Sequence, residues 1–184
     1  MERSAGQGDH IMTTGFDLVD TLLLAVFPIA MVIAAVSDLL TMQISNRISL
    51  LLIAAFAVFA GWVGLDWSVI GMHVLTAAVV LLLGFTAFAF GQMGGGDAKL
   101  AAVIGLWFGW SYTIQFLLIA SVIGGGLTLG ILMLRRMPLP AAITHIPWFA
   151  RIYSAANGVP YGLALTAGAL IVYPNTLWLT AALH

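Results

Sequence analysis

The sequence contains no cysteine and very few charged residues. Of its 184 residues only 7% are Asp, Glu, Lys or Arg, whereas 62% are hydrophobic. The lack of cysteine excludes disulfides, a thiolate nucleophile and any cysteine-ligated metal centre. A soluble domain carries roughly 25% charged residues, so these few charges cannot cover the surface of a water-soluble globule. The composition therefore predicts an integral membrane protein.

Cationic side chains are equally sparse. The chain has six Lys and Arg against seven Asp and Glu, which gives a formal net charge of -1. Nucleic-acid-binding proteins gather Lys and Arg into a patch, and this sequence has none. The four histidines are dispersed without the spacing of a metal site. We therefore expect no nucleic-acid partner, no metal and no cofactor.

Long apolar runs divide the chain into candidate transmembrane helices. A helix needs about 20 apolar residues to cross a hydrocarbon core of roughly 30 Å. The segments that reach or approach this length are 16–37, 48–65, 69–90, 98–110, 112–134 and 159–183. Pro174 should kink or end the regular part of the last segment. The sequence therefore predicts an all-α polytopic membrane protein in which residues 16–184 form one domain of six transmembrane helices. Residues 1–15 are expected to form a flexible extracytoplasmic N-terminus.

The fourth and fifth segments could instead form one helix. A continuous helix over 98–134 would be ~55 Å long, which exceeds one crossing. A break near 109–111 gives six crossings and places three loops, 38–47, 91–97 and 135–158, on the same side. The basic residues in or beside these loops are Arg47, Lys99, Arg135, Arg136 and Arg151. Five crossings would divide these residues between the two sides. The positive-inside rule therefore favours six crossings, with the three loops cytoplasmic and both termini outside.

Two aspartates are expected on this cytoplasmic side. Asp38 ends the first segment and Asp97 opens the fourth, so the two can meet in space although they are far apart in sequence. A carboxylate in or beside hydrocarbon is costly and marks a functional site by default. Two carboxyl groups at about 3 Å share one proton. Such a pair can hydrolyse an amide bond, because the ionised member activates water while the protonated member donates to the carbonyl oxygen.

Helix dipoles suggest which aspartate carries the shared proton. Asp97 is expected at a helix N-terminus, where backbone N–H groups and the dipole stabilise negative charge. Asp38 is expected at a helix C-terminus, where the dipole opposes it. We therefore expect Asp97 to be the more often ionised member and Asp38 the more often protonated one.

The residues around Asp97 are expected to shape the active-site loop. Gly94, Gly95 and Gly96 carry no side chains, so a substrate backbone could approach closely. Lys99 points to a different helix face from Asp97. Its ammonium is expected to set membrane orientation and reach the interface, and a direct catalytic role stays open.

Other polar and small residues have a structural interpretation. His73, on an otherwise apolar segment, is expected to form a hydrogen bond between helices, and Asp66 to lie in a solvated turn. The second glycine triplet, 124–126, is expected to allow close helix packing. Aromatic residues beside one arginine at 148–153 favour a short helix at the membrane interface.

The motifs around the two aspartates resemble those of a known family. Type IV prepilin peptidases are polytopic aspartic proteases with a Gly-x-Gly-Asp signature. The similar stretches here are Ser37-Asp38, Ile44-Ser45-Asn46-Arg47, residues 94–100 (Gly-Gly-Gly-Asp-Ala-Lys-Leu) and residues 157–162 (Asn-Gly-Val-Pro-Tyr-Gly). The resemblance extends from about residue 17 to the end of the chain. One departure is Ser45, where the family often has proline.

The resemblance implies that Asp38 and Asp97 are the catalytic residues of an aspartic endopeptidase in the cell (inner) membrane. The substrate would be a prepilin, whose short basic leader is removed just before a hydrophobic helix at the cytoplasmic face. The short chain is similar to the form associated with tight-adherence (Flp-type) pili. Longer relatives have a cysteine-bearing cytoplasmic region and also N-methylate the product. This chain has no such region, so methyltransferase activity is not expected.

Two alternatives stay open at the level of sequence. One is an intramembrane aspartic protease that cleaves other leader or signal peptides. The other is a small ion-coupled transporter, because intramembrane aspartates and glycine-broken helices also mark transport pathways. The position of both aspartates at one membrane face, instead of the midplane, argues against a transporter.

Overall fold

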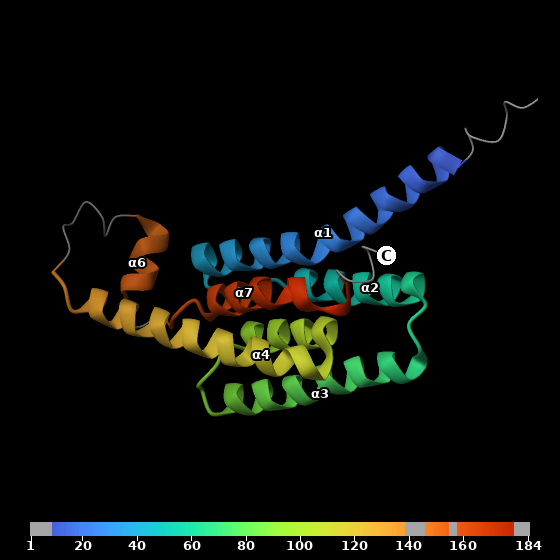
Figure 1. The fold of residues 1–184 in the computed structure, drawn as a ribbon. Coiled ribbons are helices and arrows are strands. Elements are labelled where there is room, and N and C mark those ends of the chain that lie inside the picture. Colours follow the sequence, from blue (N-terminus) through green and yellow to red (C-terminus); the bar gives the residue numbers. More distant parts are fainter. Residues whose placement is uncertain (1–8, 139–145, 155–157, 179–184) are drawn as a thin grey trace, which may run out of the picture.

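The computed structural model describes residues 9–138, 146–154 and 158–178, and within these ranges all regular structure is helical. The helices are α1 (Asp9–Thr41), α2 (Asn46–Val63), α3 (Trp67–Ala89), α4 (Gly95–Arg135), α6 (Pro147–Tyr153), α7 (Tyr161–Val172) and the 3-10 helix η1 (Tyr173–Asn175). Figure 1 shows them as a bundle from which the N-terminal part of α1 projects. The predicted all-α fold class is confirmed.

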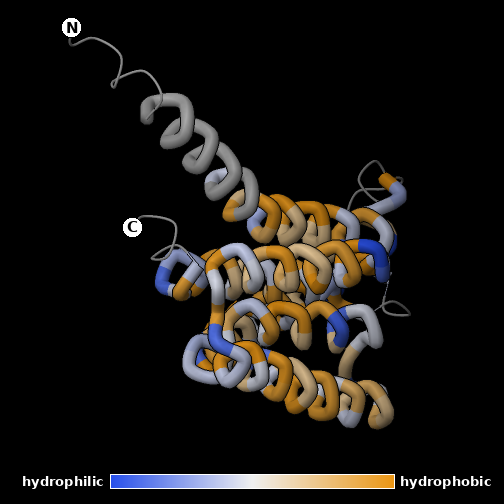
Figure 2. The backbone as a smooth tube through the Cα atoms, turned by 90° about the vertical axis from the view of Figure 1, so that its right-hand side faces the viewer, coloured by the Kyte–Doolittle hydropathy of each residue, from blue (hydrophilic) through white to orange (hydrophobic). Residues whose placement is uncertain are grey.

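The outer faces of the bundle are apolar. Leu82 is 68% exposed and Val122 is 76% exposed, and many other large apolar side chains face outward. Figure 2 shows hydrophobic residues along the length of the helices, with hydrophilic positions mainly near helix ends. Exposed apolar surface on this scale marks contact with a membrane. By length and composition, four of the described helices, α1 to α4, can each cross a bilayer. The protein is therefore a multi-pass membrane protein.

The number of spanning helices differs from the six predicted segments for two reasons. The predicted fourth and fifth segments are the two parts of α4, whose 41 residues count as one candidate span although the helix is interrupted at Gly109. The last predicted segment contains α7, whose 12 residues are fewer than one crossing needs. As expected, the regular helix ends before Pro174, which lies in η1. At the other end of the chain, α1 begins at Asp9 instead of Phe16. The predicted N-terminal segment is thus helical from Asp9 onward, and residues 1–8 lie outside the described ranges.

The course of α4 changes at Gly109, where the sequence predicts a break. Gly109 has φ 64° and ψ -176°, a conformation that is strained for residues with a side chain. The chain turns back at this point (Figure 1). A Cβ atom on Gly109 would also lie 3.0 Å from Nε2 of His73. Both the backbone angle and the close packing therefore require glycine at the break.

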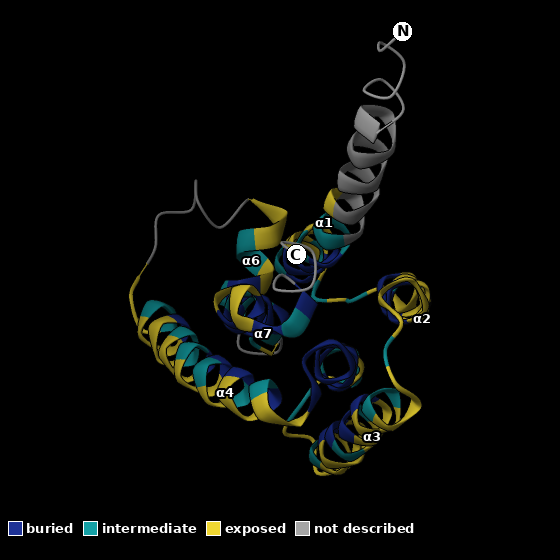
Figure 3. Cartoon of the chain, turned by 45° about the vertical axis from the view of Figure 1, so that its right-hand side comes forward, coloured by how far each residue is buried: buried dark blue, intermediate teal, exposed yellow. Residues whose placement is uncertain are grey.

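The half of α4 before this break is the centre of the bundle. Residues 98 and 100–109 are all buried, and Figure 3 shows a buried central helix enclosed by the others. Its Trp107 indole N–H donates to the carbonyl oxygen of Leu52 in α2 at 3.0 Å. Trp107 also packs against the rings of Phe27, Phe59 and Trp178. This aromatic cluster lies about 15 Å along the helix from Asp97.

Three further interpretations of single residues or segments can be compared with the fold. His73 forms the expected bond between helices, with Nδ1 2.7 Å from the carbonyl oxygen of Leu106. Asp66 is exposed in the turn before α3. A Cβ atom on Gly124 would overlap the Tyr161 ring, so the predicted close packing holds at this glycine, whereas Cβ atoms on Gly125 and Gly126 would meet nothing within 4 Å.

The connection between α4 and α7 is held to the end of α4 by one arginine. Arg135 donates from Nε to the carbonyl oxygen of Ile152 at 2.9 Å and from Nη2 to that of Gly158 at 3.0 Å. The short helix α6 lies within this connection, where the sequence predicts an interfacial helix. These bonds fix the start of α7 beside the end of α4.

Candidate active site

Asp38 lies in the last turn of α1 and is held by the start of another helix. Its side chain is only 5% exposed. Its Oδ2 atom accepts a hydrogen bond from the backbone N–H of Gly162 at 2.7 Å, and the N–H of Leu163 also bonds to the carboxylate. Gly162 and Leu163 belong to the first turn of α7, whose N–H groups have no partner within their own helix. Asp38 therefore caps α7 although it ends α1.

Asp97 lies in the first turn of α4 and bonds back to the start of its own helix. The backbone N–H of Gly94, the residue that caps α4, donates to its carboxylate. This is the reciprocal half of a capping box, in which the third helical residue reaches back to the cap. The other oxygen, Oδ1, is buried and has no hydrogen-bond partner among the described residues. Asp97 is thus fixed by one oxygen and leaves the other available.

The two aspartates border the same cavity at one end of the bundle. This cavity of about 320 Å³ is lined by residues from the α1–α2 connection and from the start of α4: Asp38, Met42, Gln43, Ile44, Gly94, Gly95, Gly96 and Asp97. The two carboxyl groups are close enough to interact electrostatically. The structure therefore brings together Asp38, Asp97 and all three glycines that the sequence singles out. It does so because the end of α1 and the start of α4 lie at the same end of the bundle.

Glycines lie directly against both carboxylates. A Cβ atom on Gly94 would be 2.8 Å from Oδ2 of Asp97, and one on Gly162 would be 2.8 Å from Oδ2 of Asp38. Contacts this short require the carboxylate to move. By contrast, a Cβ atom on Gly95 would make ordinary contacts of 3.4 to 3.7 Å with the Phe88 ring, and one on Gly96 would be 3.3 Å from Cβ of Ile44.

The structure removes the basis of the expected difference in charge between the two aspartates. That expectation considered only the helix on which each aspartate lies. Asp38 does end α1, but its carboxylate accepts N–H groups from the start of α7. Hydrogen bonds to the charged form stabilise that form. These hydrogen bonds therefore offset part of the cost of burying a charge at Asp38, whereas Asp97, with its unpartnered Oδ1, is the better carrier of a proton.

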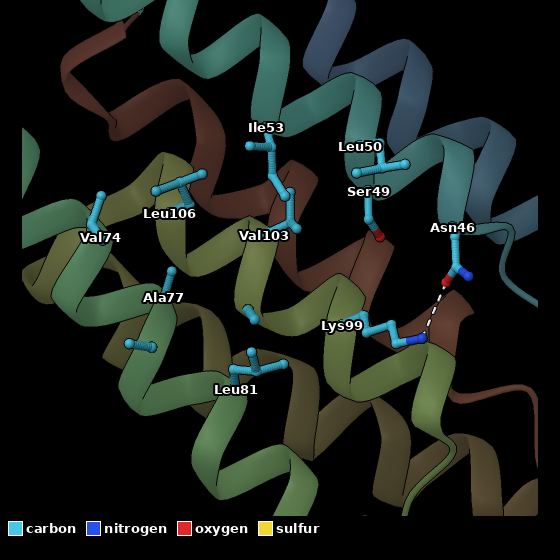
Figure 4. A pocket seen from close by; sticks show the side chains of 12 residues that line it. Asn46, Ser49, Leu50, Ile53, Val74, Ala77, Leu81, Lys99, Val103 and Leu106 are labelled. Carbon is cyan, nitrogen blue, oxygen red and sulfur yellow. Dashed lines mark hydrogen bonds between the residues drawn. The ribbon is translucent and has the colours of Figure 1, made fainter.

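Lys99 is not part of the cavity that the aspartates share. Its Nζ donates to Oδ1 of Asn46 in α2 at 3.2 Å. As Figure 4 shows, its side chain lies along a groove between α2, α3 and α4 that contains neither aspartate. The different helix face predicted for Lys99 explains this position. Lys99 thus links the start of α4 to α2 and does not line the cavity of the two aspartates.

A second cavity reaches Asp97 from the other side. It has a volume of about 650 Å³ and runs along α4 and α7 from the end of α3. Its lining includes Gly94 and Asp97, which also line the smaller cavity, together with Leu117, Tyr161 and Leu165. Asp97 and Gly94 therefore form the boundary between a small cavity with both carboxylates and a longer groove along the helices.

Sequence reasoning did not assign Gly162 and Ile44 to the site. Gly162 belongs to the stretch 157–162, which the sequence links to function only through the family resemblance, and Asn157 in that stretch lies outside the described ranges. The feature of the sequence that points to Gly162 is Pro160 at the start of an apolar helix. The N–H groups of the residues that follow have no partner within that helix and can bind a carboxylate. Ser45 occupies the cap of α2, and its hydroxyl accepts from the N–H of Arg47 at 3.3 Å. This departure from the family pattern therefore has a local structural role.

Within residues 9–138, 146–154 and 158–178, no three His, Asp or Glu side chains are grouped so as to hold a metal ion. Comparison with curated proteins and with solved structures gave no match. Comparison with protein families gave a match to the type IV leader peptidase family over residues 25–129, more than half of the chain. This range includes both Asp38 and Asp97, whereas α7, which binds the Asp38 carboxylate, lies beyond it. The chain therefore belongs to the type IV leader peptidase family.

Proposed function

We propose that the protein is a membrane-embedded aspartic endopeptidase that removes the short basic leader from Flp-type prepilins at the cytoplasmic face of the membrane. The observation that carries this proposal is the shared cavity of Asp38 and Asp97, two buried or half-buried carboxylates from distant parts of the chain. Membership of the type IV leader peptidase family supports peptidase chemistry at this site. Asp38 and Asp97 are the proposed catalytic residues.

The hydrogen bonds at the two aspartates suggest a division of roles. Asp38, stabilised as an anion by the N–H groups of Gly162 and Leu163, accepts a proton from the attacking water. Asp97 carries the shared proton on Oδ1 and donates it to the oxygen of the scissile carbonyl as the C–O bond to water forms. Asp38 then returns its proton to the amide nitrogen while Asp97 takes back a proton from a hydroxyl of the gem-diol, so that the C–N bond breaks, the carboxyl group of the product forms and both aspartates regain their starting states. Atoms and charge balance over this sequence with water as the only co-reactant.

The two cavities that meet at Asp97 suggest how a substrate lies. An extended backbone fits the small cavity, because Gly94, Gly95 and Gly96 leave room for it beside the carboxylates. The hydrophobic helix that follows the cleavage site fits the longer groove along α4 and α7. In that groove Ser121 and Thr128 bond to carbonyl oxygens of their own helix, so their hydroxyl groups need no partner from a substrate. A chain passing from one cavity to the other crosses the position of Asp97.

We further propose that the chain crosses the membrane six times, in the order α1, α2, α3, the two halves of α4, and α7 with the residues that follow it. The turn at Gly109 supports separate crossings by the halves of α4. The basic residues flank helix ends at the end of the bundle where the aspartates lie: Arg47, Lys99, Arg135, Arg136 and Arg151. Under the positive-inside rule this end is cytoplasmic, and both termini are then extracytoplasmic.

The two alternative activities differ from the proposed one in the peptide that is cleaved or in the need for a transport path. A protease for other leader or signal peptides would use the same dyad and differ only in the peptide that it accepts. A transporter would need a path from the aspartates to the opposite face. The cluster of Phe27, Phe56, Phe59, Trp107 and Trp178 fills that part of the bundle, which favours a peptidase over a transporter.

Co-expression with a prepilin tests the proposal. The intact protein should shorten the prepilin by the length of its leader, seen as a size shift on a gel and located by N-terminal sequencing of the product. Asp38→Asn and Asp97→Asn, expressed at the same level, should leave the precursor intact. Processing by either variant would contradict the dyad. Cleavage of unrelated signal peptides but no prepilin would identify the other protease, and ion flux that needs both aspartates without any cleavage would identify a transporter.

A further inference from the structure

The groove that holds Lys99 is separate from the site of the aspartates. It has a volume of about 610 Å³ and lies between α2, α3 and α4. Its walls are mainly apolar and are formed by Ser49, Leu50, Ile53, Val74, Ala77, Ala78, Leu81, Ala102, Val103 and Leu106, with Asn46 and Lys99 at one end. Figure 4 shows this arrangement, with the apolar side chains on one side of Lys99 and Asn46 on the other.

The walls of this groove are open to the surroundings of the bundle. Leu50 is 65% exposed, Val74 is 52% exposed and Ile53 is 45% exposed. These residues belong to helices that can span a bilayer, so hydrocarbon is the medium that they face. From Lys99 to Leu106 the groove extends about 10 Å along α4, which is the length of several methylene groups. The part of the groove beyond Lys99 therefore suits a lipid acyl chain.

The polar end of the groove carries an uncompensated positive charge. The ammonium of Lys99 donates to the neutral amide oxygen of Asn46, and no carboxylate among the described residues forms an ion pair with it. Because Oδ1 of Asn46 accepts from Lys99, its amide N–H groups stay available beside the ammonium. Asn46 also begins α2, and a helix N-terminus favours an anion. A phosphate could accept hydrogen bonds from both Nζ of Lys99 and the side-chain amide of Asn46.

We propose that this groove is a binding site for one anionic phospholipid. Its phosphate binds Lys99 and Asn46, and one acyl chain lies against Leu50, Ile53 and Val103. Basic pockets between transmembrane helices are suited to acidic lipid headgroups because the charge and the hydrocarbon surface are adjacent. This inference does not depend on the proposed peptidase activity, since neither Asp38 nor Asp97 lines the groove.

Native mass spectrometry of the purified full-length protein tests the site. The protein in detergent is mixed with equal amounts of phosphatidylglycerol and phosphatidylcholine that have identical acyl chains. The intact protein should retain one phosphatidylglycerol with about fivefold preference, the effect of one basic residue at a lipid headgroup. Lys99→Met keeps the apolar stem and removes the charge, so this preference should vanish, whereas Lys99→Arg should keep it.

Two further variants distinguish lipid binding in the groove from a general effect of surface charge on lipid binding. Arg136 is exposed at the end of α4 and lies outside the groove, so Arg136→Met should retain the preference of the intact protein. Ala78 is an exposed residue of the groove, so Ala78→Trp should fill it and reduce retention of both lipids without altering charge. Circular dichroism confirms that each variant is folded. Equal retention of the two lipids by the intact protein, or an unchanged preference in Lys99→Met, would overturn the proposal.

Discussion

Asp38 and Asp97 both lie beside a helix start and a glycine, but they differ in which helix supplies their hydrogen-bond donors. Each carboxylate accepts backbone N–H groups at a helix start, and each lies against a glycine whose Cβ atom would be 2.8 Å away. Asp38, however, binds two N–H groups of a different helix, whereas Asp97 binds one of its own helix and has a buried oxygen without a partner. One carboxylate of the pair is therefore anchored by a second helix, and the other has an oxygen free to carry a proton.

The largest expected effect comes from removing either acid. Asp38→Asn and Asp97→Asn keep the size of the side chain and remove the ionisable group. Because general acid-base catalysis contributes roughly 10² to 10⁴ in rate, each variant should lose about a hundredfold to ten-thousandfold in prepilin cleavage. The measurement is a time course with purified enzyme and prepilin in detergent. Normal cleavage by either variant would break the comparison, because the proposed reaction needs both acids.

Crowding the anchored aspartate should have the next largest effect. In Gly162→Ala the added methyl group meets both Oδ2 of Asp38 and Cδ1 of Ile44 at 2.8 Å. The carboxylate must move away from the α7 N–H groups, and a displacement of about 1 Å can lower a rate roughly a hundredfold. We expect a ten- to hundredfold loss of cleavage with the helix content unchanged. Gly71→Ala is the control, because its Cβ atom meets nothing within 4 Å, and a similar loss in that variant would refute the explanation.

The anchoring role can be separated from catalysis by stability measurements. Asp38→Ala leaves the N–H of buried Gly162 without its partner, which costs about 1–3 kcal/mol in the free energy of unfolding. Asp97→Ala leaves only the N–H of Gly94 without its partner, and because Gly94 is exposed, water can replace the carboxylate, so the cost should be smaller. Thermal unfolding in detergent, followed by circular dichroism, should therefore give a lower midpoint for Asp38→Ala than for Asp97→Ala. The reverse order would contradict the assignment of Asp38 as the anchored member.

The smallest effects are expected within the glycine triplet. Gly94→Ala places a methyl group 2.8 Å from Oδ2 of Asp97, so cleavage should fall about tenfold as this carboxylate shifts. Gly95→Ala makes only ordinary contacts with Phe88 and should keep cleavage within about twofold. Both are compared in the same prepilin assay at equal enzyme concentration. If the two variants behave alike, access of the substrate backbone, and not the position of Asp97, determines the need for glycine.

The sequence was most informative where local chemistry decides the structure. The length of the apolar run 98–134 required a break, and Gly109 provides it with a backbone conformation suited to glycine. Asp38 and Asp97 could be selected because carboxylates are rare in apolar segments. The contact of Asp38 with α7 could not be predicted, because it depends on how α1 packs against a helix more than a hundred residues later. Local charge arguments therefore gave an incomplete account of Asp38.

The position of Lys99 illustrates the same limit of local information. Helical spacing showed that Lys99 and Asp97 point in different directions. It could not show that α2 and α3 form a groove on that side, because the groove is made by residues from all three helices. Likewise, α1 begins at Asp9, before the apolar run at 16–37, so hydrophobic periodicity does not mark its start.

The aromatic cluster around Trp107 and Trp178 has a consequence for energy coupling. Its packed rings, with the two indole N–H groups bonded to backbone carbonyls, close the bundle below the carboxylates. Under the proposed function, water enters and protons leave through the same membrane face. No charge then moves through the electric field during a turnover, so neither the membrane potential nor a pH gradient across the bilayer would drive or oppose the reaction.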